Sequence, residues 1–299
     1  MRRPVPPPRS TWLPLVEAAL AEDLGSGDVT SALVFDPLDA TRARLEARQD
    51  LIVCGLEVAR AVFARVDPGV KVQAVVEEGA RVAAGTALAY AEGATLGILA
   101  AERSALNFLG RMCGVATHTR RFVDAAAGSG VEIVDTRKTL PAWRTLDKYA
   151  AAVGGARNHR MGLFDGILLK DNHIAAAGGL DAAVRRALRD APAGLRVQVE
   201  VQSEDEARAA LAAGADFLLL DNLPPERIAP IARSAGPEVV LEASGGITLD
   251  DVRAYARSGA RRLSIGALTH SAPNADVALE IDVTAPATRA GAAPGGASR

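Results

Sequence analysis

The sequence predicts an incomplete parallel α/β barrel that follows a smaller region of mixed or antiparallel strands. From residue 131 onward, short and mostly apolar runs alternate with amphipathic helical segments, which is the pattern of parallel βαβ units. The alternation of apolar runs and helical segments continues without a change, and this favours a barrel over an open doubly wound sheet. Only six such runs are present, so the barrel is expected to be incomplete or to have hidden strands.

The N-terminal third predicts one helix and a set of short strands. Apolar residues recur at helical spacing over residues 11–22, and the loop EDLGSGDVTS follows. Residues 41–92 are expected to form strands, because CG, EEG, AAG and AEG interrupt them. Part of this region is similar to the glycine-punctuated hairpins of biotinyl and lipoyl carriers. Those carriers need a lysine at the hairpin tip, and none lies between Lys71 and Lys138, which disfavours a carrier role.

A long amphipathic helix is expected over residues 96–126, with small residues that allow close packing. The six barrel strands should then be VEIVDT, DGILLK, LRVQVEV, ADFLLLDN, VVLEASG and RRLSIG. The segments LDAAVRRALRDA, SEDEARAALAAG, PERIAPIARSAG and LDDVRAYARSG should supply helices between most of them. Ser203 and Thr248 stand just before two of these helices and are expected to cap them.

The composition excludes several classes of partner. The net charge of −2 over 299 residues argues against nucleic acid or an anionic membrane as a partner. No stretch approaches the roughly 18 apolar residues of a membrane span. Cys54 and Cys113 are too few for a disulfide scaffold and are expected to be buried. These features suit a reducing cytoplasm. Residues 286–299 have the composition of a disordered tail.

Polar or charged residues follow every predicted barrel strand. Because the carboxyl ends of barrel strands form the active-site mouth, these side chains are expected to share one site, although a solvated rim would explain any one of them. They are Asp135, Arg137, Lys138, Lys170, Asp171, Asn172, Glu200, Asp221, Asn222, Glu242, Ser244, Ser264 and Gly266.

Positive charge is concentrated between residues 135 and 173. Guanidinium and ammonium groups together suit carboxylates and phosphates, so an anionic ligand is favoured over a solvated face. Of the histidines, His159 and His270 are the better ligand candidates, and His118 and His173 are expected to be structural. The seven cations, set against four aspartates, are Arg137, Lys138, Arg144, Lys148, Arg157, Arg160 and Lys170.

Two glycine-containing loops predict a phosphate site. EASGGIT places Ser244, Gly245 and Gly246 after one strand, and SIGALTHS repeats the arrangement around Gly266. Glu200 and Asp221 are expected at matching depth on adjacent strands, where they could bind Mg²⁺, bind sugar hydroxyls, or act as acid and base.

The quoted segments, with ERSALNFLGRMCGVAT and the long run from residue 135 to 173, closely resemble the quinolinate phosphoribosyltransferase family (nicotinate-nucleotide pyrophosphorylase, carboxylating). The resemblance covers nearly the whole chain. It implies an N-terminal α/β sandwich domain, residues 1–112 joined by 271–285, then an open α/β barrel, residues 113–270. It also implies a homodimer with active sites between subunits, and Mg²⁺ as the cofactor.

The implied reaction joins quinolinate to phosphoribosyl pyrophosphate (PRPP) and yields nicotinate mononucleotide, pyrophosphate and CO₂ for NAD synthesis. The alternatives are a paralogue acting on another carboxylated substrate and a non-catalytic protein that binds a phosphorylated metabolite. By resemblance, Lys138, Lys170, Glu200 and Asp221 are catalytic, with Glu200 and Asp221 at the metal. The remaining implied substrate-binding residues are Arg103 from the partner subunit, Thr136, Arg137, His159, Arg160, Ser244, Gly245, Gly246, Ile265, Gly266, Ala267 and His270.

Overall fold

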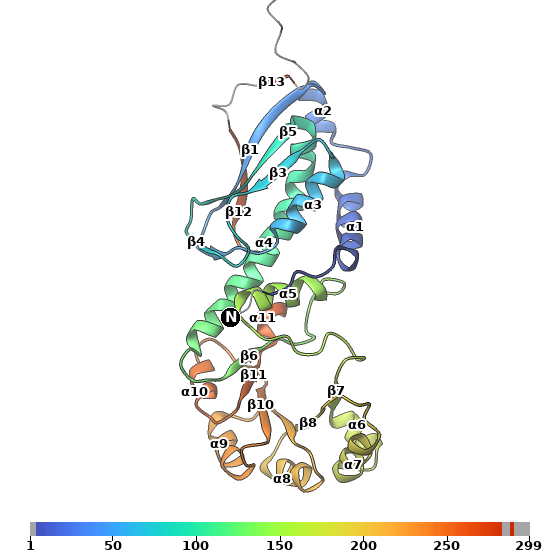
Figure 1. Cartoon of the computed structure of the whole chain (residues 1–299), viewed down its shortest axis with the longest axis vertical. Helices are drawn as coiled ribbons and strands as arrows, with labels where there is room; N and C mark the ends of the chain where they lie inside the picture. The colour runs from blue at the N-terminus through green and yellow to red at the C-terminus, as the bar shows by residue number, and fades with distance from the viewer. Residues whose placement is uncertain (1–3, 283–287, 290–299) are drawn as a thin grey trace, which may run out of the picture. The chain divides into compact units, whose positions relative to one another are not determined.

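The structure, a computed structural model, describes residues 4–282 and 288–289, which fall in two compact units (Figure 1). The N-terminal unit holds the described residues up to Thr117, Thr145–Gly154, and those from Pro273 onward. The barrel unit holds His118–Arg144 and Gly155–Ala272. The boundary expected between residues 112 and 113 and the observed division after Thr117 both lie inside helix α4 (Thr95–Ala125), whereas residues 145–154, expected in the barrel, cluster with the N-terminal unit.

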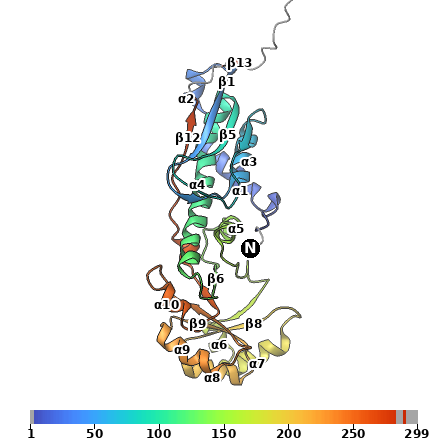
Figure 2. The ribbon, with the colours of Figure 1, turned by 60° about the vertical axis from the view of Figure 1, so that its left-hand side comes forward.

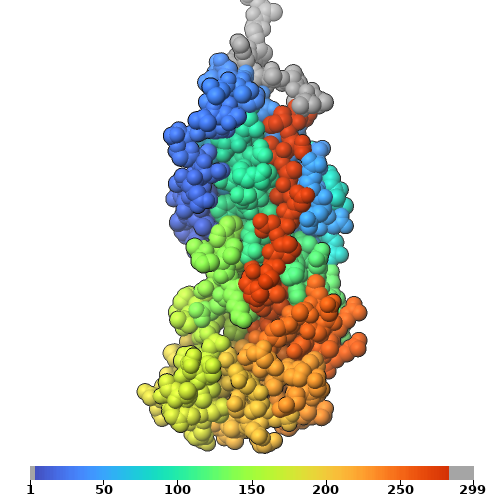
Figure 3. Space-filling view, turned by 180° about the vertical axis from the view of Figure 1, so that it is seen from behind, coloured from blue at the N-terminus to red at the C-terminus, as the bar shows by residue number. Residues whose placement is uncertain are grey.

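An antiparallel sheet forms the N-terminal unit, in the order β12-β1-β5-β3. The C-terminal strand β12 lies beside β1 (Figure 3), so residues distant in the sequence complete one sheet. Of the tail expected to be disordered, Thr288–Arg289 pair with β1 as β13, and the rest lies outside the described residues. The strands are β1 (Asp39–Ala47), β3 (Lys71–Ala74), β5 (Ala87–Ala94) and β12 (Val277–Ile281), with a separate pair β2 (Leu51–Ile52) and β4 (Arg81–Val82).

Helix α3 (Leu56–Val66) was not expected, because residues 41–92 predict only strands. Its buried residues, Val58, Val62 and Phe63 among them, recur at helical spacing. Its start depends on a long-range contact, since Glu78 accepts a hydrogen bond from the Gly55 amide at 2.6 Å. The other helices of this unit are η1 (Arg9–Thr11), α1 (Leu13–Leu24), α2 (Val29–Val34) and α5 (Arg144–Gly154), whose first residue belongs to the barrel unit.

The barrel unit has six parallel strands in the order β6-β11-β10-β9-β8-β7, which confirms the predicted fold class. Within the described part of the chain, β6 and β7 do not pair, so the barrel is open (Figure 1, with a turned view in Figure 2). The strands are β6 (Glu132–Val134), β7 (Ile167–Leu169), β8 (Val197–Val201), β9 (Phe217–Asp221), β10 (Val240–Ser244) and β11 (Arg262–Ser264).

One predicted helix cap is confirmed and the other is wrong. Ser203 accepts a hydrogen bond from the Glu206 amide at 3.1 Å at the start of α8. The Thr248 side chain makes no cap: its amide donates to Asp251 at 2.7 Å, its carbonyl accepts from the Val252 amide at 3.0 Å, and the helix begins only at Val252. The barrel helices are α6 (Asp171–Ala176), α7 (Leu180–Asp190), α8 (Glu204–Ala212), α9 (Pro225–Ser234), α10 (Val252–Ala256) and α11 (Ala267–His270).

Arginines and one aromatic ring close the amino ends of the barrel strands. The guanidiniums of Arg196 and Arg262 lie 5.2 and 5.3 Å from the centre of the Phe217 ring. Glu132 pairs with both Arg262 and Arg157. This arrangement leaves the carboxyl ends as the open mouth of the barrel.

No helix in the described ranges is long and apolar enough to cross a bilayer.

Candidate active site

The register of the parallel strands brings the predicted polar residues to one edge. Asp221, Ser244 and Ser264 stand in one row across β9, β10 and β11. Glu200 aligns with Leu219, so Asp221 lies two residues farther toward the carboxyl end. The expectation of matching depth was therefore wrong. The two carboxylates still share a face of the sheet, because side chains alternate with a period of two.

Asp135 anchors the loop that carries His159 and Arg160. Its carboxylate is fully buried and accepts hydrogen bonds from Asn158 Nδ2 at 2.6 Å and from the His159 amide at 2.7 Å. The Asp135 amide in turn donates to the Arg157 carbonyl at 3.1 Å. Two loops separated by 22 residues of sequence are thus fixed side by side at the end of β6.

The guanidiniums of Arg137 and Arg160 are close enough for their charges to interact. Burial lowers the pKa of Arg160, and the neighbouring charge of Arg137 lowers it further. Arg160 is oriented by a hydrogen bond from Nη1 to the Gly166 carbonyl at 3.0 Å. The Nε of Arg137 is buried and has no hydrogen-bond partner among the described residues. Like charges held together without such a partner are typical of a site that receives an anion.

Lys170 and Glu200 form the closest ion pair in the mouth, with Nζ and Oε2 2.6 Å apart. The Glu200 side chain is only 9% exposed, whereas that of Lys170 is 47% exposed, so the lysine can also reach a ligand from solvent. Their strands are neighbours, and Lys170 directly follows β7. The pair therefore brings one cation and one anion to the same side of the mouth.

Lys138 lies against the second glycine loop. A side-chain carbon on Gly266 would be 3.1 Å from both Lys138 Cδ and His270 Nε2, which brings these residues together. The Lys138 backbone is held at both ends, because its amide donates to Thr136 Oγ1 at 3.0 Å and its carbonyl accepts from Thr269 Oγ1 at 2.7 Å. Lys138 itself is exposed at the mouth.

The first glycine loop bends sharply after β10. Gly245 and Gly246 have φ values of 104° and 62°. A side-chain carbon on Gly245 would lie 2.2 Å from Asn222 Oδ1, so the two loops approach as closely as glycine permits. Asn222 donates to Asp221 Oδ2 at 2.7 Å and thereby orients that carboxylate. In the second loop, Ile265 is buried and can offer a ligand only its backbone, and Ala267 begins α11.

Three of the seven predicted cations have other contacts or lie in the other unit. Arg144 braces a loop by donating to the Met161 carbonyl at 3.1 Å and to Thr139 Oγ1 at 3.2 Å. Arg157 pairs with Glu132 at the amino end of β6. Lys148 is buried in α5, in the N-terminal unit. Arg144 and Arg157 thus have partners of their own, and a role for any of the three in an anion site stays a prediction.

The remaining predicted residues are accounted for individually. Arg103 is exposed on the N-terminal unit, and its reach into a partner's site stays a prediction. His118 packs edge-on against Phe122 with ring centres 5.2 Å apart, as expected of a structural histidine. His173 accepts the Lys170 amide at 3.1 Å through Nδ1 and so caps α6.

The acidic residues fit Mg²⁺ only together with a ligand. Across residues 4–282 and 288–289, no group of three or more His, Cys, Asp or Glu side chains could hold a metal ion. Glu200 and Asp221 offer two carboxylates on one face, and Mg²⁺ commonly binds one or two carboxylates plus substrate phosphates. These residues therefore suit a metal ion that arrives with a diphosphate.

Sequence analysis missed Asn158 and Gln198. Gln198 is 2% exposed and lies 3.0 Å from His159 Nε2. A polar residue inside the apolar run VQVEV, two positions before Glu200, was the available signal. Asn158 gave no signal, because only the fold brings it to Asp135.

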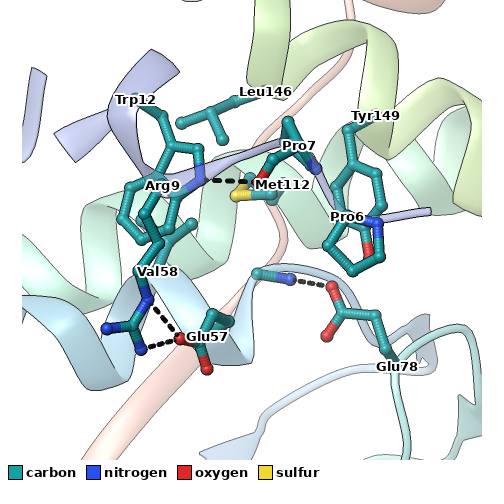
Figure 4. A pocket seen from close by; sticks show the side chains of 11 residues that line it. Pro6, Pro7, Arg9, Trp12, Glu57, Val58, Glu78, Met112, Leu146 and Tyr149 are labelled. Carbon is teal, nitrogen blue, oxygen red and sulfur yellow. Dashed lines mark hydrogen bonds and ion pairs between the residues drawn. The ribbon is translucent and has the colours of Figure 1, made fainter.

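A second hollow, of about 380 Å³, lies in the N-terminal unit (Figure 4). Trp12, Met112 and Tyr149 line it together with Glu78. The Glu78 carboxylate already accepts from the Gly55 amide, so it serves the start of α3. This hollow is largely apolar, and Arg9, the one cation among the described residues that line it, already pairs with Glu57.

Comparison with known proteins gives a consistent result. Residues 28–113 match the family model "Quinolinate phosphoribosyl transferase, N-terminal domain", and residues 115–280 match the model of its C-terminal domain. A nicotinate-nucleotide pyrophosphorylase [carboxylating] of Mycobacterium leprae is 40% identical over 272 residues, covering 89% of this chain and 95% of that protein. A "probable" enzyme of the same name from Bacillus subtilis is 36% identical over 263 residues, covering 88% and 91%.

A solved structure supports the same relationship. The nicotinate-nucleotide pyrophosphorylase of Francisella tularensis superposes with a TM-score of 0.89 at 35% identity, covering 94% of this chain and all of that one.

Proposed function

Because the chain belongs to the quinolinate phosphoribosyltransferase family, we propose that it joins quinolinate to PRPP and releases pyrophosphate and CO₂. The product is nicotinate mononucleotide, a precursor in NAD synthesis. The observation that carries this proposal is the set of cations at the strand ends: Lys138 lies against the Gly266 loop, Lys170 pairs with Glu200, and Arg160 is close enough to Arg137 for their charges to interact.

The cations match the charge of the substrate. Quinolinate has two adjacent carboxylates, and removing them from water is costly unless several cations compensate. Arg137 and Arg160 can each form paired hydrogen bonds with a carboxylate, because the guanidinium is a planar fork. Lys138 and Lys170 supply compact charges where a guanidinium would be too wide.

The glycine loops suit the phosphate of the sugar. Ser244, Gly245 and Gly246 present backbone N–H groups and a hydroxyl without bulky side chains. Gly266 does the same beside Lys138 and His270. We assign the 5′-phosphate of PRPP to these two loops.

The acidic residues suit the chemistry at the ribose. Breaking the bond between C1′ and the diphosphate leaves a cationic, oxocarbenium-like sugar, which the carboxylates of Glu200 and Asp221 can stabilise. Mg²⁺ held by these carboxylates and the diphosphate would neutralise charge on the leaving group. Arg137 and Arg160 hold the pyridine so that its ring nitrogen forms the new bond to C1′.

Decarboxylation follows from the new positive charge on the ring nitrogen. The bond from C2 to its carboxylate breaks, CO₂ leaves, and the electron pair stays on C2 beside the pyridinium nitrogen. A proton then adds to C2 and gives the nicotinate ring. The cations of the mouth hold the remaining carboxylate through this step, which keeps the ring in place.

Two further parts of the proposal concern the assembly and its location. Arg103 is exposed on α4 and belongs to a different unit from the barrel, which suits a role in the site of a partner in a homodimer. Cys54 and Cys113 are free thiols, which suits a cytoplasmic location.

The test is a turnover assay with quinolinate, PRPP and Mg²⁺ that follows both pyrophosphate and CO₂. The two products should form in equal amounts and only when quinolinate is present. Lys138→Ala should lower kcat/KM by roughly 10²- to 10³-fold, the size expected for loss of a charge that stabilises the transition state. The control is Lys71→Ala, which changes an exposed lysine of β3. Pyrophosphate release with another pyridine acid but not quinolinate would contradict the proposal.

A further inference from the structure

A buried carboxylate inside the barrel has no hydrogen bond. Glu242 in β10 is 0% exposed, and neither of its carboxylate oxygens accepts a hydrogen bond from the described residues. His159 Nε2 lies 3.3 Å from Oε1, which is within ion-pair range but outside hydrogen-bond geometry. A buried carboxylate is costly without a partner, and the Nε2 side of the His159 ring is a polar group within its reach.

Gln198 approaches the same nitrogen from β8. Its Oε1 is 3.0 Å from His159 Nε2, and its own amide nitrogen is buried without a partner. An amide oxygen can only accept, so Nε2 must carry the proton in this arrangement. Two acceptors, from Gln198 and Glu242, therefore converge on one ring nitrogen.

The other nitrogen of the ring is also occupied. Nδ1 of His159 lies 2.9 Å from the Arg160 backbone amide, which donates to it. A proton on Nδ1 would face that N–H group, so this contact also requires a ring protonated at Nε2 alone. The His159 side chain is only 16% exposed. Both ring nitrogens are thus used within the barrel.

We propose that Glu242 and Gln198 make His159 a positioning residue, whose ring fixes the Arg160 backbone and so places its guanidinium near Arg137. This differs from the direct contact between His159 and a quinolinate carboxylate that the family resemblance implies. The inference rests on the proposed function for its link to quinolinate. The hydrogen bonding of the ring does not depend on that function.

The first test reads the ring directly by ¹⁵N NMR of the imidazoles. The chain has only four histidines, and His159→Gln identifies the signals of His159. The wild type should show His159 with Nδ1 unprotonated and Nε2 protonated. Glu242→Gln, which keeps an acceptor, should preserve this tautomer, whereas Glu242→Leu and Gln198→Leu should mix the two tautomers. A wild-type ring protonated at Nδ1 would overturn the proposal.

The second test is kinetic. Glu242→Leu should raise KM for quinolinate at least tenfold while kcat and KM for PRPP change less than twofold, and Glu242→Gln should recover most of the loss. Thr119→Val is the control, because it also removes a fully buried polar atom that has no hydrogen-bond partner in the described barrel unit. It should leave KM for quinolinate unchanged.

The outcomes separate the two proposals. Unchanged KM for quinolinate in folded Glu242→Leu would overturn the positioning role, and so would equal changes in both KM values and kcat. If Glu242→Leu does not fold, Gln198→Leu makes the same prediction. A wild type that does not turn over quinolinate would defeat the proposed function, while the NMR test of His159 would still stand.

Discussion

One glycine allows the bend after β10. Gly245 has a φ of 104°, and a side-chain carbon there would lie 2.2 Å from Asn222 Oδ1. Gly245→Ala is therefore expected to lower the free energy of unfolding by about 2–4 kcal/mol, from left-handed strain and overpacking together. It should also raise KM for PRPP, because the loop must shift. Urea denaturation and steady-state kinetics measure the two effects.

Gly128→Ala is the matched control for this prediction. Gly128 has a φ of 81°, but nothing lies within 4 Å of the position that its side-chain carbon would take. Only the strain of about 1–2 kcal/mol should appear there. Equal losses of stability in the two variants would show that the contact with Asn222 has no cost.

At the scale of residues, the sequence predicted which kinds of side chain form the site better than it predicted which individual residues belong to it. The strand-end rule predicted that Lys170 and Glu200 lie near each other, and they pair at 2.6 Å at the ends of neighbouring strands. The count of cations between residues 135 and 173 also included Lys148, which lies on α5 of the N-terminal unit. The strand-end rule gave no role to the pairing of Gln198 with His159, which only the folded barrel creates.

Helix α8 begins at a side-chain cap, and the next predicted cap is absent. Ser203→Ala should cost about 1 kcal/mol of unfolding free energy, because the Glu206 amide loses its acceptor. Thr248→Ala should cost less than about 0.5 kcal/mol, as expected of a surface change that removes no cap. Thermal or urea denaturation of both variants checks the difference. A larger loss in Thr248→Ala would contradict the observed start of α10.

Helix α3 gives the N-terminal unit a pH-dependent element. Burial raises the pKa of the Glu78 carboxyl above its ordinary value of 4.5, although the amides of Gly55 and Leu56 and the Cys54 and Tyr149 side chains partly offset this. Between 4.5 and the raised value, the folded state binds more protons than the unfolded state. The free energy of unfolding should therefore fall as pH rises through this window.

Glu78→Gln isolates that effect, because glutamine keeps an acceptor for the Gly55 amide and does not titrate. The difference in unfolding free energy between wild type and variant should change with pH just above 4.5 and then level off. Denaturation at several pH values measures it. Parallel stability curves for the two proteins would mean that burial does not perturb Glu78.

At the scale of elements, local sequence patterns were sufficient to predict the helices and strands that local interactions determine. The six barrel strands and the cap of α8 followed from apolar runs and from a serine in the right place. The strand register did not follow, so Glu200 and Asp221 were expected at equal depth. Helix α3 also escaped notice, because Glu78 caps it from 23 residues away in sequence.

The molecule as a whole is close to neutral, and its barrel mouth combines several cations with carboxylates such as Glu200 and Asp221. A net charge of −2 provides no general attraction for anions, so binding of a dianion must rely on fixed local groups. Burial lowers the pKa of Arg160, and the charge of Arg137 lowers it further, as expected of two like charges that repel each other. A ligand with two carboxylates would relieve that repulsion, and one with a single carboxylate would relieve it less.

Calorimetric titration of quinolinate into wild-type protein and Arg160→Gln tests this central claim most directly. Wild type should bind one quinolinate per chain, and Arg160→Gln should weaken binding at least tenfold, about 1.4 kcal/mol. Arg208→Gln, which changes a side chain that is 75% exposed on α8, should bind like wild type. Unchanged affinity in a folded Arg160→Gln protein would contradict the account.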